Sequence, residues 1–201
     1  IDGQDQYAPL VGVLRDLQVQ ISQWKRSDPQ ALQDSSEQFA HFLEALAKQA
    51  NLSTEAKILL AQGYASLDKP KQGLELLRSI GEPPNSTIES PPMPPPENAT
   101  DMERAAYAEA RAKHEKAQQA HEAAIRLHHF AELTEVRLLR QAIRLATDPA
   151  DKTKYVAEVE KLLDRMIGSP EKPGWAFNSL EVRREKIFLL EDLGKYRAAM
   201  D

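Results

Sequence analysis

The stretch that decides the fold runs from Lys57 to Ile80 and reads KILLAQGYASLDKPKQGLELLRSI. Helix-forming residues fill it on both sides of Asp68-Lys69-Pro70, which has the composition of a turn. Proline fits the first turn of a helix, because its missing N–H would have no partner there, so Pro70 marks the start of a second helix. The stretch therefore predicts a helical hairpin.

Two further helix starts combine an aspartate with a proline in the same way. Asp28 precedes Pro29, and Asp148 precedes Pro149. Aspartate at the N-cap accepts a hydrogen bond from the first turn, and proline suits the first helical position. No segment shows the strict alternation that is typical of a strand. The chain is therefore predicted to be all-α, with about seven to eight helices in successive pairs.

The helical pairs repeat along the chain. Residues 59–64 align with residues 138–143, and the same offset places Pro70 on Pro149. Repeated helix–turn–helix units are the signature of an α-solenoid, in which each pair buries its apolar face against its neighbours.

Residues 57–80 resemble the tetratricopeptide repeat family, in which small residues lie where paired helices cross and large ones fill the gaps. Ala61 and Gly73 are the small residues, and Tyr64 is a large one. The likeness is partial over about 20 residues near the C-terminus and is architectural elsewhere. In that stretch Leu190, Gly194-Lys195-Tyr196 and Ala199 fit the pattern, whereas Lys186 and Ile187 depart from it. The resemblance implies a right-handed α-α superhelix of helical hairpins. It also implies a groove, lined by the first helix of each pair, that binds a peptide or a partner protein.

Prolines divide the sequence into three parts. Residues 82–100 hold seven of the 13 prolines, so they are predicted to form a linker or an ordered loop between helical hairpins in 1–81 and in 101–201. The motif from Pro91 to Pro96 could also dock in an aromatic groove of a partner, although the flanking residues are Glu89 and Glu97 rather than basic. The chain ends inside what reads as a new helix, so we expect a fragment of a longer protein.

The segment from Thr100 to Thr147 is rich in alanine and contains neither proline nor glycine. It is predicted to form either one helix of about 70 Å or two helices that divide near His128-His129. Alanine or leucine recurs there at one heptad position, which permits close packing between two such helices. A structural spacer that self-associates into a homodimer is therefore the alternative to a partner-binding scaffold. The heptad positions are Ala110, Ala117, Ala124, Ala131, Leu138 and Leu145.

Several classes of chemistry find no support in the composition. The chain has no cysteine, which excludes disulfides and thiol nucleophiles, and its net charge of −5 disfavours nucleic-acid binding. The sequence contains no run of about 18 apolar residues, so no segment is predicted to insert in a membrane. His114, His121 and His128 are spaced too far apart to ligate one metal ion. No catalytic motif or cofactor loop is recognisable, so we expect a non-enzymatic protein without metal or cofactor.

The exposed faces of the predicted first helices supply the candidate partner-binding residues. Lys57 and Gln62 lie on one of them, and Arg137, Arg140 and Arg144 lie on another. The three arginines, spaced three and four residues apart, form a basic strip on one helical face that suits acidic groups of a protein or peptide. The sequence carries no signal for a cellular compartment.

Overall fold

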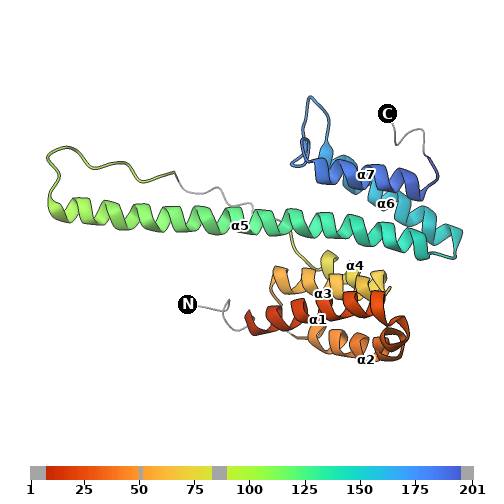
Figure 1. The fold of residues 1–201 in the computed structure, drawn as a ribbon. Coiled ribbons are helices and arrows are strands. Elements are labelled where there is room, and N and C mark those ends of the chain that lie inside the picture. Colours follow the sequence, from red (N-terminus) through yellow and green to blue (C-terminus); the bar gives the residue numbers. More distant parts are fainter. Residues whose placement is uncertain (1–7, 50–51, 83–89, 196–201) are drawn as a thin grey trace. The chain divides into compact units, whose positions relative to one another are not determined.

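The computed structural model describes residues 8–49, 52–82 and 90–195, and in these ranges it consists of α-helices with no β-strand. The predicted all-α class is therefore confirmed. Figure 1 shows the helices in chain order. They are α1 (Ala8–Ser27), α2 (Pro29–Ala47), α3 (Thr54–Ser66), α4 (Pro70–Arg78), α5 (Asp101–Leu145), α6 (Pro149–Ile167) and α7 (Leu180–Asp192).

The predicted helix starts carry the expected caps. The carboxylate of Asp28 accepts a hydrogen bond from the backbone N–H of Ala31 at 3.0 Å, and that of Asp148 accepts one from Ala150 at 2.9 Å. Each of these two aspartates precedes a proline that begins its helix. Local sequence therefore sets where α2 and α6 begin.

The first four helices pack as two adjacent hairpins around a common apolar core. Helix α3 packs against α1, α2 and α4 (Figure 1). At the crossing of α3 and α4, a Cβ on Gly73 would lie 2.9 Å from the carbonyl oxygen of Ala61. The small residues at 61 and 73 therefore let the two helix backbones approach closely. The core consists of Leu14, Ile21, Leu43, Leu46, Leu59, Leu60, Tyr64 and Leu67.

Helix α5 is one continuous helix whose two halves differ in burial. None of its side chains from Asp101 to Phe130 is fully buried, whereas ten from Ala131 to Ile143 are. By packing, the chain divides into a helical unit of residues 1–80 and 130–201 and an extension of residues 81–129. This division differs from the one based on proline content because the apolar half of α5 belongs to the helical unit.

The extension pairs the proline-rich segment with the first half of α5. Residues 90–99 run back along that half of the helix (Figure 1), and the Arg104 guanidinium donates to the carbonyl oxygen of Glu97 at 3.1 Å. Pro92 and Pro95 are half-buried, whereas the neighbouring Met93 is 87% exposed. A spacing of three residues is the period of a polyproline helix, so one face of this segment is covered. Residues 90–100 therefore contact the helix that follows them, while residues 83–89 lie outside the described ranges.

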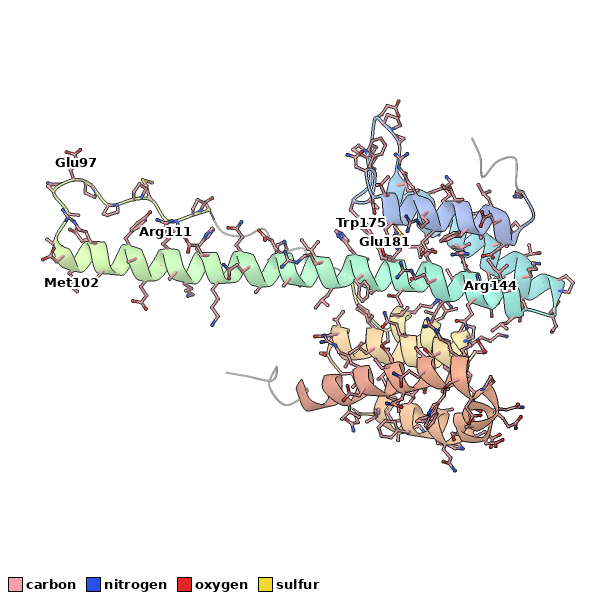
Figure 2. The ribbon with its side chains drawn as sticks, viewed as in Figure 1. Glu97, Met102, Arg111, Arg144, Trp175 and Glu181 are labelled. Carbon is pink, nitrogen blue, oxygen red and sulfur yellow. The ribbon has the colours of Figure 1, made fainter. Side chains whose placement is uncertain are left out.

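The start of α5 is fixed by the predicted capping box. The Thr100 backbone N–H donates to a Glu103 carboxylate oxygen at 2.7 Å, and the Glu103 N–H donates to the Thr100 hydroxyl at 3.3 Å. Side chains on this half of α5, such as Met102 and Arg111, project from the helix in Figure 2. Met102 is 84% exposed.

Candidate functional site

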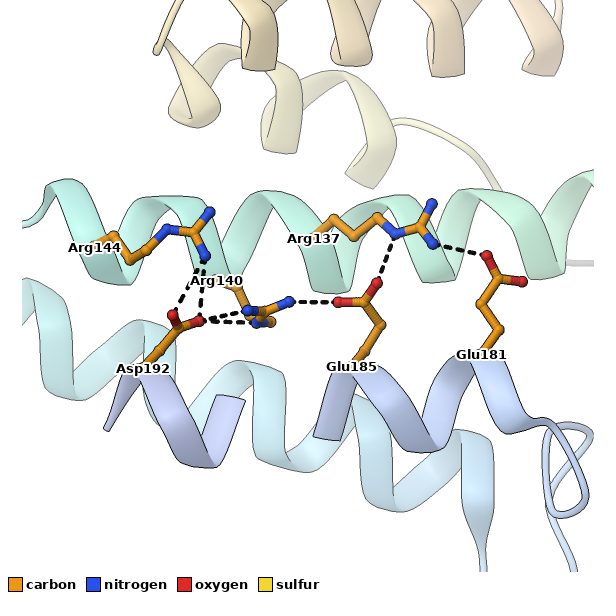
Figure 3. Close-up of polar contacts among 6 residues, drawn as sticks. All are labelled: Arg137, Arg140, Arg144, Glu181, Glu185 and Asp192. Carbon is orange, nitrogen blue, oxygen red and sulfur yellow. Dashed lines mark hydrogen bonds and ion pairs between the residues drawn. The ribbon is translucent and has the colours of Figure 1, made fainter. Parts of the chain in front are cut away.

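The predicted basic strip on α5 faces helix α7. Figure 3 shows Arg137, Arg140 and Arg144 opposite three carboxylates of α7. Arg137 donates from Nη2 to Glu181 at 2.7 Å and from Nε to Glu185 at 2.8 Å. The three arginines are therefore side chains at a helix–helix contact.

Arg140 lies at the centre of this network. Its Nη1 is 2.6 Å from Glu185 Oε2, and its Nη2 is 2.8 Å from Asp192 Oδ2. Its guanidinium group also lies over the ring of Phe188, 5.0 Å from the ring centroid. Arg144 contacts the same Asp192 oxygen at 3.3 Å. The Arg140, Glu185 and Asp192 side chains are only 11%, 7% and 14% exposed, so this ion network is largely shielded from water.

The network balances the charge of the strip inside the chain. Three guanidinium groups face three carboxylates, and each buried charge has at least one partner of opposite sign (Figure 3). Burial lowers the pKa of Arg137, but its hydrogen bonds to Glu185 and Glu181 outweigh this and raise it above its ordinary value. Contact of the three arginines with an acidic partner stays a prediction.

Lys57 and Gln62, the other two sequence candidates, also make contacts within the chain. The Lys57 ammonium donates to the backbone carbonyl of Ser79 at 2.9 Å, at the C-terminal end of α4. The side-chain oxygen of Gln62 accepts a hydrogen bond from the Gln18 side chain of α1 at 3.3 Å. Lys57 thus faces α4, Gln62 faces α1 and the arginines face α7, so the structure does not bring the five residues together.

Helices α4 and α6 are joined by charged side chains that the sequence analysis does not single out. Lys71 contacts Asp151 at 3.0 Å, and Arg78 contacts Glu158 at 2.6 Å. Both pairs are separated by 80 residues, so α4 and α6 run in a constant register. Burial raises the pKa of the neighbouring Glu135, against the opposing effect of Arg78 at 3.5 Å.

A second group of charges joins α5 to α6 and to the loop that follows. Glu132, a buried carboxylate on α5, accepts from Arg165 at 2.6 Å and from the indole N–H of Trp175 at 2.6 Å. Trp175 itself is 42% exposed. The loop that carries it is therefore held to α5 by a charge-assisted hydrogen bond.

In the described part of the chain, a groove lies between helices α2 and α4. It measures about 740 Å³, which is within the usual range for a ligand site. We call it the α2–α4 groove. It is lined by polar side chains around a smaller apolar surface, and the described lining consists of Glu37, Ala40, His41, Glu44, Ala47, Lys48, Tyr64, Lys69, Gln72, Glu75, Leu76 and Ser79.

Charged side chains line this groove together with Tyr64. Lys48 holds Glu44 at 3.0 Å and lowers the pKa of that carboxyl group through a hydrogen bond. Burial raises the pKa of Tyr64, and the carboxylates of Glu44 and Glu75 raise it further. All three side chains line the groove. The candidate binding residues named from the sequence lie on first helices, so this groove was not predicted. The seven-residue spacing of Glu37 and Glu44 places both carboxylates on one face of α2, and this was the sequence signal for the groove.

Two other classes of site can be addressed for the described residues. None of their helices combines the length and the apolar composition that a membrane crossing requires. Within the same ranges, no cluster of three or more His, Cys, Asp or Glu side chains is arranged to hold a metal ion.

Comparison with models of protein families found no match for this chain, and comparisons with curated proteins and with solved structures found none either.

Proposed function

We propose that residues 1–80 and 130–201 form a tetratricopeptide-like array of helical hairpins that acts as a non-enzymatic scaffold for a partner protein. In such an array α1–α2, α3–α4 and α5–α6 are successive pairs, and α7 is the first helix of a fourth. First helices then pack on first helices, and second helices pack on second helices.

The contacts between like helices are the observation that carries this proposal. Gln18 of α1 donates to the carbonyl of Leu59 in α3 at 2.9 Å. Gln141 of α5 donates to the carbonyl of Ala65 in α3 at 2.8 Å, and the arginines of α5 contact α7. Along the other face, the two ion pairs between α4 and α6 repeat the same relation for second helices. These contacts are those expected of a stack in which each hairpin packs only on its neighbours.

A stack of this kind suits binding rather than chemistry. Its surfaces are long and rigid, and its grooves lie between helices that are fixed by their own core. The α2–α4 groove supports the proposal because it is large enough for side chains of a partner.

Site-directed photo-cross-linking tests the proposal. A benzoylphenylalanine replaces Gln72, which lines the groove, and a control variant carries it in place of Lys154, which is exposed on α6. Both proteins are irradiated in an extract of the cells that make the chain, and adducts are identified by mass spectrometry. We expect one protein to be enriched from position 72 over position 154. The same adducts at both positions, or none, would contradict the proposal.

One observation favours the structural spacer as a second candidate. Ala110 and Ala117, at the heptad position that permits close packing, are exposed on the first half of α5. A second copy of this helix could pack there. Light scattering separates this candidate from a monomeric scaffold.

A further inference from the structure

We propose that the α2–α4 groove binds an arginine or lysine side chain of the partner, which is held by the hydroxyl of Tyr64 and the carboxylates of Glu37 and Glu75. This inference rests on the proposed scaffold function, and it names the chemistry of the segment that the groove receives.

The phenol of Tyr64 is the first reason. Tyr64 is only 4% exposed, and its ring lies in the core shared by α1, α2 and α3. Its side chain also lines the groove, but its hydroxyl makes no hydrogen bond to any described residue. The hydroxyl is not among the described buried side-chain atoms that lack a partner, so it is accessible and available to a ligand in the groove.

The charge of the lining is the second reason. Glu37, Glu44 and Glu75 supply three carboxylates, and Lys48 and Lys69 supply two ammonium groups. Lys48 forms an ion pair with Glu44, and the charge of Lys69 also lowers the pKa of Glu44. Neither Glu37 nor Glu75 forms an ion pair with a described residue. Two carboxylates therefore remain for an incoming cation.

The combination selects a cationic side chain with a long aliphatic stem. A phenol oxygen and two carboxylates accept hydrogen bonds, and guanidinium and ammonium groups only donate them. Ala40, Ala47 and Leu76 line the same groove and offer apolar surface to the stem of the side chain. An acidic side chain would meet Glu37 and Glu75 as like charges.

A pair of synthetic peptides tests the inference. The probe is the blocked peptide Gly-Ser-Ala-Leu-Arg-Leu-Ala-Ser-Gly, and its twin carries citrulline, which has nearly the same shape as arginine without the charge. Each peptide is titrated into the ¹⁵N-labelled full chain, and binding is followed by amide chemical shifts. We expect the arginine peptide to shift resonances of α2 and α4, and the citrulline peptide to bind roughly tenfold more weakly.

Three variants locate the site. Tyr64→Phe removes only the hydroxyl, and the double variant Glu37→Gln with Glu75→Gln removes only charge. Each is expected to weaken the arginine peptide roughly tenfold while the melting temperature does not fall. Glu160→Gln, on the exposed face of α6 outside the groove, is the matched control and should change nothing.

Equal affinity for the two peptides, shifts outside α2 and α4, or no binding would overturn the inference. The scaffold proposal fails separately. A cross-linked partner that binds the Gln double variant as well as the wild type would overturn the groove assignment and leave the scaffold intact. Selective binding of the arginine peptide without any cross-linked partner would support the groove assignment and overturn the scaffold proposal.

Discussion

Replacing Glu185 with alanine is expected to destabilise the helical unit far more than replacing Glu181, although both carboxylates lie on α7 and contact Arg137. The two pairs have nearly equal lengths, at 2.8 Å and 2.7 Å. They differ in surroundings, because the Glu185 side chain is 7% exposed and that of Glu181 is 60% exposed. Glu185 also holds Arg140, which is itself shielded.

The expected magnitudes follow from this difference in burial. Removing one partner of a buried ion pair costs about 3–5 kcal/mol, because the remaining charge loses its compensation. Arg140 keeps Asp192 at 2.8 Å, so we expect the lower limit of about 3 kcal/mol for Glu185→Ala. In a unit of this size that corresponds to a fall of about 6–12 °C in Tm. An exposed pair contributes about 0–1 kcal/mol, so Glu181→Ala should leave Tm nearly unchanged.

Urea denaturation of the full chain gives the free energy of unfolding of each variant. Helix content followed by circular dichroism reports on all helices, and the fluorescence of Trp24 and Trp175 reports on α1 and on the loop before α7. Coincident transitions would justify a two-state treatment. A double variant, Arg140→Met with Glu185→Leu, should lose less stability than the sum of its single changes, because neither charge is left alone. Equal losses for Glu185→Ala and Glu181→Ala would refute the reasoning.

Three further predictions address packing, burial and self-association. Gly73→Ala should destabilise the chain by about 1–3 kcal/mol in denaturant titrations, because its Cβ would meet a backbone oxygen of α3, whereas Gly12→Ala has open space and should stabilise α1 by about 0.5–1 kcal/mol. Burial raises the pKa of Glu135. Its contribution to stability is therefore fully present below the ordinary carboxyl pKa and is lost as pH rises through the raised pKa. Glu135→Gln should therefore gain Tm relative to wild type at pH 7 but not at pH 4, and a constant difference would contradict this. Light scattering should give the mass of one chain, unchanged by Ala110→Glu with Ala117→Glu; a dimer that these changes dissociate would favour the spacer.

The elements that local sequence specifies were predictable from it. An aspartate cap followed by proline defines the start of α2 and of α6, because both act within one helical turn. The absence of proline and glycine after Thr100 allowed one long helix, and the structure shows one. The small residues at 61 and 73 lie at the crossing of α3 and α4. Periodicity and caps were therefore sufficient for the hairpins.

The partners of the predicted site residues could not be read from the sequence. The three arginines of α5 form a strip on one helical face, but their carboxylates lie 44–52 residues further along the chain. Lys57 looked exposed because nothing local shows that the end of α4 reaches its ammonium group. The α2–α4 groove likewise arises from the distance between two helices, which depends on packing rather than on either helix alone. Nonlocal contacts decided the roles of these residues.

The affinity of the cross-linked partner for charge-reversed variants tests the central claim most directly. Once identified, the partner is titrated with wild type, Glu75→Lys and the matched control Glu160→Lys by isothermal titration calorimetry. A scaffold that holds a basic segment in the α2–α4 groove predicts at least roughly tenfold weaker binding for Glu75→Lys and no change for the control. Unchanged affinity in Glu75→Lys, or equal losses in both variants, would contradict it.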